Sequence, residues 1–300
     1  MRILFIFALF VLLAPPRSPA APVVVRVVAA NLTSDRYQRW SPDNGNHSNP
    51  EGAGARILKA LRPDVVLIQE FNTSIPVRQW VNATFGPDHA FTREEGSGIP
   101  NGVISRFPIA ASGEWDDPVL ANRDFAWARI ALPGGRPLWA VSVHFHAKRS
   151  ENRRLEAEAL LACLRREVPD GDMVVLGGDF NTRAADEPCL AALAGYFRLP
   201  DPRPADHLGD ADTNAPRNRP YDWVLADNEL QALATPVAVA GRVFPGGLVF
   251  DTRTFPALAA LAPAQAGDSA LKQMQHMAVV RDFALPDGGK KGATGPPNFE

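Results

Sequence analysis

The stretch Met173-Val-Val-Leu-Gly-Gly-Asp-Phe-Asn181 places two polar residues directly after a short apolar run. The run has the length and the β-branched residues of a buried strand. Asp179 and Asn181 stand two positions apart, so one turn can direct both side chains into the same cleft. A single Asp after a strand is most often only a turn former. Whether Asp179 and Asn181 belong to a functional site therefore depends on whether other apolar runs also carry polar residues at their ends.

Five further apolar runs carry a polar residue at one end. Asn31, Glu70 and His144 follow or end three of them, and Asp222 and His276 stand at the beginning of the last two. We expect strands at 23–30, 65–69, 102–105, 125–132, 138–144, 173–178, 221–225 and 277–283. One buried histidine is usually only a core residue. Six such placements together predict one convergent site on a rigid scaffold.

Three stretches between these runs have helical character, at 52–61, 151–168 and 187–193. Ser150 is expected to be the N-cap of the second helix, although no Glu follows at the position that would complete a capping box. Many strands with few helices predict an α/β or α+β layered domain, which we place at residues 21–285.

The composition is that of a globular chain with a large core. Of its 300 residues, 46% are hydrophobic and 21% are charged, and the net charge is −2. This balance excludes a global basic field for capturing nucleic acid, so any anion must be bound locally. The 28 prolines favour many loops over a helical bundle. Two cysteines are too few for a disulfide scaffold or a Cys-rich zinc module.

Residues 1–20 are typical of a secretory signal peptide. Arg2 precedes an apolar run at 3–14, and Ser18 and Ala20 are small residues at the −3 and −1 positions of a cleavage site. The run is too short to span a membrane as a helix. We therefore expect export to the periplasm or the medium, without stable membrane insertion. Cleavage removes two arginines and no acid, which gives the mature chain a net charge of −4.

Two smaller features concern the termini and the thiols. Residues 286–300 are rich in Gly, Pro and Lys and are expected to form a flexible tail. In an oxidising compartment Cys163 and Cys189 form a disulfide or remain two buried thiols, and the sequence leaves both alternatives open. We expect the protein to be a monomer.

Taken together, the polar residues occur in the order and approximate spacing of the endonuclease/exonuclease/phosphatase superfamily, which the chain resembles over roughly residues 23–283. The segments that carry the resemblance are Asn31, Gln69-Glu70, Gly102-Val-Ile-Ser-Arg106, His144, Gly178-Asp-Phe-Asn181, Tyr221-Asp222 and His276. The resemblance implies a four-layer sandwich of two mixed β-sheets flanked by helices. It also implies a metal-dependent phosphoesterase.

The resemblance implies a metal site as well. Glu70, Asn31 and Asp179 are expected to bind Mg²⁺ or Mn²⁺, hard cations that prefer oxygen ligands. Asn31 is also expected to contact the phosphate. The family usually has an Asp where this chain has Gln275, which leaves a second metal position open. Two acids are candidates to replace it: Asp251 and Asp268.

The implied catalytic residues are two histidines with their partners. Asp222 is expected to fix the tautomer of His276 and raise its basicity. His144 is expected to donate to a phosphate oxygen. Asp179 is expected to position water or the metal, and Asn181 to bind the scissile phosphate. Two acids are candidates to orient His144: Glu94 and Glu95.

Two short segments resemble the deoxyribonuclease I branch of the superfamily. Asn122-Arg-Asp-Phe-Ala-Trp-Ala-Arg129 is similar to a segment whose arginine contacts a phosphate, which assigns that role to Arg123. Asp212-Thr-Asn214 is similar to a segment that faces the phosphate, which assigns Thr213 and Asn214 to substrate binding.

Three functions are consistent with this pattern. The first is a secreted, metal-dependent phosphodiesterase, in the first instance a nuclease that acts on DNA or RNA without sequence specificity. The second is a sphingomyelinase-like enzyme or a phosphatase of inositol or small molecules, and the third is a catalytically weakened binding protein of the same fold. Tyr37 and Trp40, with Arg36 and Arg39, either stack on bases and hold phosphates or pack beneath the loop that follows. A lipid-acting enzyme would need an exposed hydrophobic hairpin, and the sequence has no clear one.

Overall fold

The first of two central sheets has seven strands, in the order β11-β15-β1-β2-β4-β3 with β14 also paired to β15. These are β1 (Val23–Ala30), β2 (Val65–Ile68), β3 (Ala90–Arg93), β4 (Gly102–Ser105), β11 (Ala234–Thr235), β14 (Leu248–Phe250) and β15 (Ala278–Leu285). β1 and β2 are parallel, and β15 is antiparallel to β1. The carboxyl ends of β1 and β2 therefore lie beside the amino end of β15.

The second sheet has six strands in the order β5-β6-β7-β8-β10-β9. These are β5 (Ile109–Trp115), β6 (Phe125–Ala131), β7 (Pro137–His144), β8 (Met173–Asp179), β9 (Phe197–Arg198) and β10 (Asp222–Asp227). β7 and β8 are parallel and β10 is antiparallel to β8, so two carboxyl ends again meet one amino end. A separate hairpin consists of β12 (Val237–Val239) and β13 (Arg242–Phe244).

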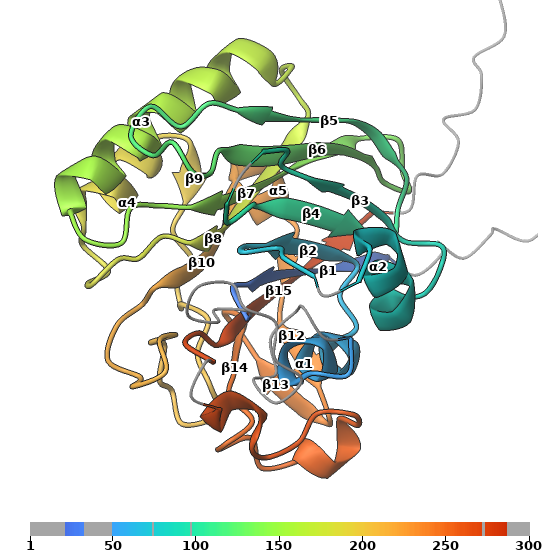
Figure 1. Cartoon of the computed structure of the whole chain (residues 1–300). Coiled ribbons are helices and arrows are strands. Elements are labelled where there is room, and N and C mark those ends of the chain that lie inside the picture. The colour runs from blue at the N-terminus through green and yellow to red at the C-terminus, as the bar shows by residue number, and fades with distance from the viewer. Residues whose placement is uncertain (1–21, 33–49, 74, 97, 272–273, 287–300) are drawn as a thin grey trace, which may run out of the picture.

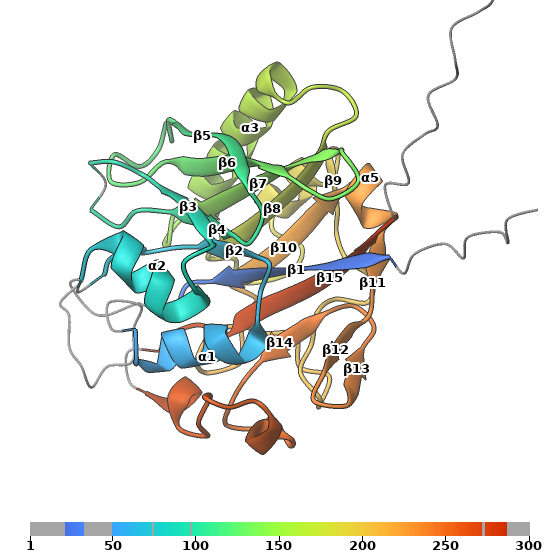
Figure 2. The same ribbon diagram turned by 90° about the vertical axis from the view of Figure 1, so that its right-hand side faces the viewer.

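Helices cover the outer face of each sheet (Figures 1 and 2). α1 (Ala53–Leu61) and α2 (Val77–Phe85) pack on the first sheet, and α3 (Ser150–Glu167) and α4 (Pro188–Leu193) on the second. The short α5 (Asn228–Gln231) and two 3₁₀ turns, Leu258–Ala260 and Asp268–Ala270, complete the elements of the described residues. This computed structural model describes residues 22–32, 50–73, 75–96, 98–271 and 274–286. The expected four-layer sandwich is confirmed.

Alternation along the strands explains why their runs are almost wholly apolar. Val27 and Ala29 of β1 face the second sheet, whereas Val28 and Ala30 pack toward α1. Both faces of the strand are thus buried, and each needs an apolar side chain. None of the helices in the described ranges has both the length and the apolarity needed to cross a membrane.

The expected elements occur within a few residues of their predicted bounds, but the N-cap of α3 differs from the predicted one. The N-cap of α3 is Arg149, and Ser150 is already in the helix. Ser150 Oγ instead donates to Glu187 Oε2 at 3.0 Å, a buried carboxylate that also binds Arg153. The expected N-cap was therefore wrong because a tertiary acceptor takes the hydroxyl.

The two cysteines are free in the structure. Cys189 is buried in the cluster between α3, α4 and the second sheet, and Cys163 packs against that cluster. Burial raises the pKa of the Cys189 thiol to about 12. Of the two alternatives left open by the sequence, a disulfide or two free thiols, the structure has two free thiols. The expected signal peptide, residues 287–300 of the expected tail, and the segment with Tyr37 and Trp40 lie outside the described residues.

A buried polar bridge joins the two sheets beneath the ends of β2 and β7. Gln69 Nε2 donates to Ser142 Oγ at 2.8 Å and to the carbonyl of Leu67 at 3.0 Å. Ser142 Oγ in turn donates to the carbonyl of Ile68 at 2.9 Å. Each such buried hydrogen bond contributes about 1 kcal/mol, and leaving one partner unpaired costs more. The bridge therefore fixes the position of one sheet relative to the other.

Gly178 on β8 makes room for this bridge. Its φ is +142°, and a Cβ there would lie 2.1 Å from the carbonyl oxygen of Val143 and 2.7 Å from Gln69 Nε2. The backbone of Val143 cannot move aside without breaking the β7–β8 pairing. Glycine is thus required at this position by both conformation and space.

We expect Gly178→Ala to lower the free energy of unfolding by about 3 kcal/mol or more, because the methyl overlaps two neighbours and φ is unfavourable. Urea denaturation measures the change. Gly267→Ala is the matched control: Gly267 has a φ of −82° and no atom within 4 Å of an added Cβ, so its stability should hardly change. A Gly178→Ala protein as stable as the control would contradict the steric argument.

Candidate active site

Strand register places three of the predicted site residues side by side. His144 at the end of β7 is the register partner of Asp179 at the end of β8. Asp179 is in turn the partner of Asp222 at the start of β10. The first sheet adds residues just beyond β1, beyond β2 and before β15: Asn31, Glu70 and His276. The predicted convergence of strand ends is therefore present in the structure.

Asp179 lies at the centre of this group. Its Oδ2 accepts from Asn31 Nδ2 at 3.1 Å, and it lies 3.2 Å from His144 Nε2 and 3.6 Å from His276 Nε2. Its Oδ1 accepts from the backbone N–H of Asn181 at 2.9 Å. Burial raises the pKa of Asp179 to about 7, against the opposing effect of His276.

Glu70 reaches the group from a sharp turn after β2. Its φ is +51°, a left-handed conformation that is uncommon for a residue with a side chain. Oε1 lies 3.5 Å from Asn31 Nδ2 and 4.0 Å from His144 Nδ1, and the side chain keeps 16% of its surface exposed. The strained turn therefore places a partly solvated carboxylate at the open side of a buried cluster.

His276, Asp222 and Thr213 form a hydrogen-bonded chain. His276 Nδ1 lies 3.0 Å from Asp222 Oδ2, and Thr213 Oγ1 donates to the same oxygen at 2.7 Å. Although burial opposes it, the charges of Asp222 and Asp179 raise the pKa of His276 to about 10. The backbone N–H of Asp222 donates to Thr213 Oγ1. The hydroxyl is therefore both a donor to the carboxylate of Asp222 and an acceptor from its backbone. The expected contact of Thr213 with phosphate stays a prediction.

The environment of His144 favours the neutral imidazole. Burial, and then the charge of Arg123, lower its pKa well below the usual value. A neutral imidazole donates from one nitrogen, and the contact of Nε2 with Asp179 identifies that nitrogen. The carboxylates near its ring nitrogens are Asp179 and Glu70. The expected pairing with Glu94 or Glu95 is therefore wrong, because these two other carboxylates occupy that place.

The loops bring three more predicted residues to the site. Arg123 is buried, and its Nε donates to the carbonyl of His144 at 2.5 Å while Nη2 donates to that of Phe145 at 3.3 Å. Asn181 Nδ2 donates to the same Phe145 carbonyl at 3.0 Å. The side chain of Asn214 hydrogen-bonds within its own loop, at 214–219. The roles of all three in binding phosphate remain predictions.

The side chains of this group suit a divalent cation. Asp179, Asp222 and His276 each offer a ligand atom, and these atoms lie within 4.8 Å of one another. Three carboxylates, with Glu70, converge in one largely buried place, where mutual repulsion is relieved most directly by a cation. The three-residue set overlaps the expected ligands only at Asp179. Glu70 and Asn31 are next to it and complete a set dominated by oxygen atoms.

The two acids considered as replacements at the position of Gln275 are engaged elsewhere. Asp251 pairs with Arg217 at 2.9 Å and with Arg253 at 2.6 Å. Asp268 pairs with Arg56. Because each carboxylate already has an arginine as counterion, the expectation that either one serves a second metal is wrong.

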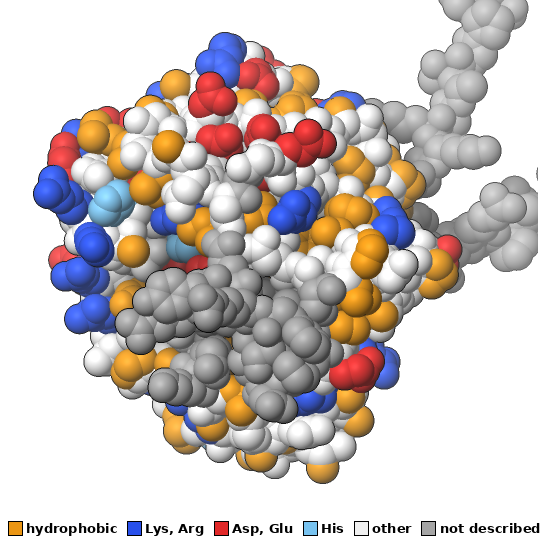
Figure 3. Space-filling view, in the orientation of Figure 1, with side chains coloured by type: hydrophobic (Ala, Val, Ile, Leu, Met, Phe, Trp, Pro, Cys, Tyr) orange, Lys and Arg blue, Asp and Glu red, His pale blue; other side chains and the backbone are white. Residues whose placement is uncertain are grey.

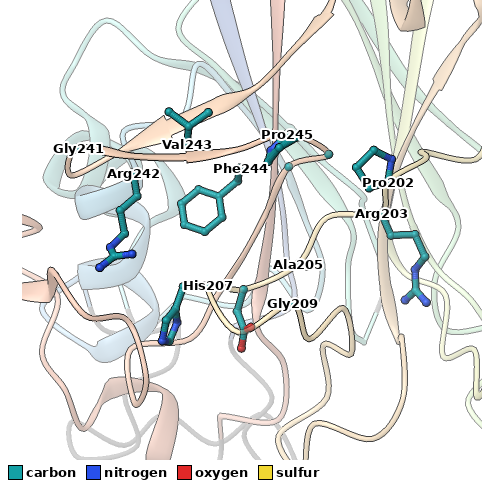
Figure 4. A pocket seen from close by; sticks show the side chains of 13 residues that line it. Pro202, Arg203, Ala205, His207, Gly209, Gly241, Arg242, Val243, Phe244 and Pro245 are labelled. Carbon is teal, nitrogen blue, oxygen red and sulfur yellow. The ribbon is translucent and has the colours of Figure 1, made fainter.

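A cavity of about 650 Å³ lies between the loop at 202–209 and the hairpin β12–β13 (Figure 4). Arg203, His207, Arg242 and Phe244 contribute to its walls. None of the predicted site residues lines it. The candidate chemistry therefore resides in the cluster at the strand ends.

Two residues of this region had no role in the sequence-based prediction. Ser142 holds Gln69, the neighbour of Glu70, and Glu156 binds the backbone next to His144. Neither stands at the end of a strand, which was the signal that identified the other residues.

Known proteins share this fold. Residues 44–259 match the model of the Endonuclease/Exonuclease/phosphatase family. An endonuclease/exonuclease/phosphatase from Beutenbergia cavernae is 18% identical over 87% of this chain and 72% of its own, with a TM-score of 0.55. One from Bacteroides vulgatus is 16% identical over 88% of this chain and 99% of its own, with a TM-score of 0.59.

A conserved protein of unknown function from Enterococcus faecalis is 10% identical over 87% of this chain and 100% of its own, with a TM-score of 0.60. The comparison with curated proteins found no match. At these identities the solved structures show the fold alone. The match to the family model spans most of the chain, and the chain therefore belongs to the endonuclease/exonuclease/phosphatase family of phosphoesterases.

Proposed function

We propose that the protein is a divalent-metal-dependent phosphodiesterase that cleaves nucleic acid without sequence specificity. The observation that carries the proposal is the cluster centred on Asp179, with one neutral histidine, one histidine paired to Asp222, and Glu70 at its open side. Hydrolysis of a phosphodiester needs neutralised phosphate oxygens, an activated water and a group that moves a proton. The cluster offers residues for each requirement.

Glu70 and Asp179, with Asn31 beside them, would hold Mg²⁺ or Mn²⁺. When bound, such a cation neutralises phosphate oxygens and lowers the pKa of a coordinated water. His276, fixed through Nδ1 by Asp222, can hold or move a proton at Nε2. His144 is a neutral hydrogen-bond donor, and Arg123 supplies a fixed positive charge behind it.

The preference for nucleic acid is supported by cations on the loops that leave the site. Lys148 and Arg149 follow β7, Arg183 follows β8, and Arg219 precedes β10. The first three are exposed, and no carboxylate in the described residues pairs with them. Figure 3 shows Lys and Arg side chains gathered along the left edge of the molecule, near α4. A polyphosphate chain passing through the site would meet several of these charges, whereas a small phosphate ester would not.

Removal of the metal is the first test. We expect the mature protein to hydrolyse bis(p-nitrophenyl) phosphate with Mg²⁺ or Mn²⁺, and EDTA to abolish this activity.

His276→Ala should lower kcat by roughly 100- to 10,000-fold because it removes the proton-transfer group. Glu70→Gln should raise the Mg²⁺ concentration needed for activity. Glu151→Gln, at an exposed position on α3, is the control. Full turnover in His276→Ala or in EDTA would disprove the proposed site.

The surface cations test the substrate. In the triple variant Lys148→Ala, Arg149→Ala, Arg183→Ala, we expect KM for plasmid DNA or RNA to rise roughly 10-fold or more and its salt dependence to weaken, because phosphate contacts are lost. Turnover of bis(p-nitrophenyl) phosphate should be unchanged. Arg165→Ala with Arg166→Ala, in the last turn of α3, is the control. Cleavage of sphingomyelin or inositol phosphates without plasmid nicking would reverse the proposed substrate preference.

We also propose that the protein is exported and that its signal peptide is removed. Residues 1–20 support this proposal by their charge, apolar run and small residues before the cleavage position. When the full chain is expressed in a bacterium, N-terminal sequencing of the exported protein should begin at Ala21. A full-length chain retained in the cytoplasm would contradict it.

A further inference from the structure

The chain segment that carries His144 is held by buried side chains. Arg123 binds the carbonyl oxygens of His144 and Phe145, and the next N–H, that of His146, donates to Glu156 Oε2 at 2.9 Å. These contacts fix successive peptide groups at the end of β7. The position of the His144 imidazole therefore depends on where Arg123 and Glu156 lie.

Glu156 faces inward from α3 and has no exposed surface. Its second oxygen, Oε1, has no donor among the described residues. The side chain that interacts with Glu156 here is another buried carboxyl, Asp117. Asp117 Oδ1 already accepts from the N–H groups of Val119 at 2.7 Å and Leu120 at 3.1 Å. A carboxyl pair without any proton would leave two acceptors in contact and no donor between them.

One shared proton resolves this contact. It converts the repulsion between two carboxylates into a hydrogen bond to an ionised acceptor, which is among the strong kinds. Burial, with the charge of Asp117 adding to it, raises the pKa of Glu156 to about 9. Two backbone N–H groups already donate to Asp117 and stabilise its ionised form, so Glu156 is the member that carries the proton.

The surrounding charges agree with a single negative charge on the pair. The charged groups facing Glu156 are Asp117 and Arg123 from the loop before β6, and the segment after β7 offers it the backbone N–H of His146. Arg153, on the same helix, has its own counterion, because it binds Glu187 at 2.6 Å. Because Arg123 also faces Asp179 and Glu70, its single positive charge does not offset two further negative charges on the pair.

We propose that Glu156 and Asp117 share one proton, and that protonated Glu156 is a positioning residue that sets Arg123 and His144 in the active site. The inference rests on the proposed phosphodiesterase function of that site. It assigns to α3, which contributes no residue to the Asp179 cluster, a direct part in the geometry of the reaction.

Conservative replacement separates this role from simple packing. Glu156→Gln keeps the acceptor for the His146 N–H and a donor for Asp117, so kcat should stay within about threefold of the wild type. Glu156→Leu fills the space without either bond and should lower kcat roughly 10- to 100-fold with little change in KM, because His144 is displaced. Glu158→Gln, at an exposed position of the same helix, is the control. Equal losses in Glu156→Gln and Glu156→Leu would overturn the proposal.

The charge count gives a second, independent variant. Asp117→Asn alone leaves Glu156 free to carry the charge, so kcat should stay within about threefold of the wild type. The double variant Asp117→Asn, Glu156→Gln keeps the hydrogen bonds but removes the single negative charge of the pair. In this variant kcat should fall roughly 10-fold or more. A double variant as active as the two single variants would overturn the proposal.

Infrared spectroscopy tests the proton without any substrate. At about pH 8, above the pKa values of Asp179 and Glu94 and below that of Glu156, the wild type should show the C=O stretch of a protonated carboxylic acid. Glu156→Gln should lack it. An unchanged spectrum would overturn the shared proton. If the wild type hydrolyses no phosphodiester, the proposed function fails, and the infrared band alone decides on the pair.

Discussion

The buried polar bridge formed by Gln69 and Ser142 is the constraint on which the site depends. The facing layers of the two sheets are apolar, and apolar contacts alone leave two sheets free to slide by small amounts. A buried amide and a buried hydroxyl permit only the one arrangement that satisfies them. Gln69 immediately precedes Glu70, and Ser142 lies two residues before His144. The bridge thus sets the distance between Glu70, after a strand of the first sheet, and His144, in a strand of the second.

With the two sheets held in place, the register of the strands aligns the other site residues. Parallel pairing of β7 with β8 aligns His144 with Asp179, and antiparallel pairing of β8 with β10 aligns Asp179 with Asp222. Residues that differ widely in sequence position therefore come within hydrogen-bond range without any special loop. The loops refine the arrangement, and two strained positions, Glu70 and Asn181, stand at the turns where the chain leaves β2 and β8.

Much of the fold could be predicted from the sequence, since a strand buried on both faces needs an uninterrupted apolar run. The strands at 23–30 and 102–105 were predicted to the residue. β5 was missed because it is Ile-Ala-Ala-Ser-Gly-Glu-Trp, with mostly exposed positions and no apolar run. The residues that converge around Asp179 were predicted from their places at strand ends, whereas Arg123, Thr213 and Asn214 were predicted only from the family resemblance. Glu156 was missed because a fully buried carboxylate in a charged helix looks like a surface residue, and only the tertiary contact with Asp117 distinguishes it.

The pairing of β1 with β15 has a consequence for the order of assembly. Arg26 and Asp282, 256 positions apart, form an ion pair across these two strands, and Asn31 and His276 lie at the far end of the same pairing. The cluster around Asp179 is incomplete until the last strand has joined the first. A nascent or partly threaded chain therefore has no finished site, however well its middle has folded. The topology therefore couples completion of the site to the pairing of the two ends of the domain.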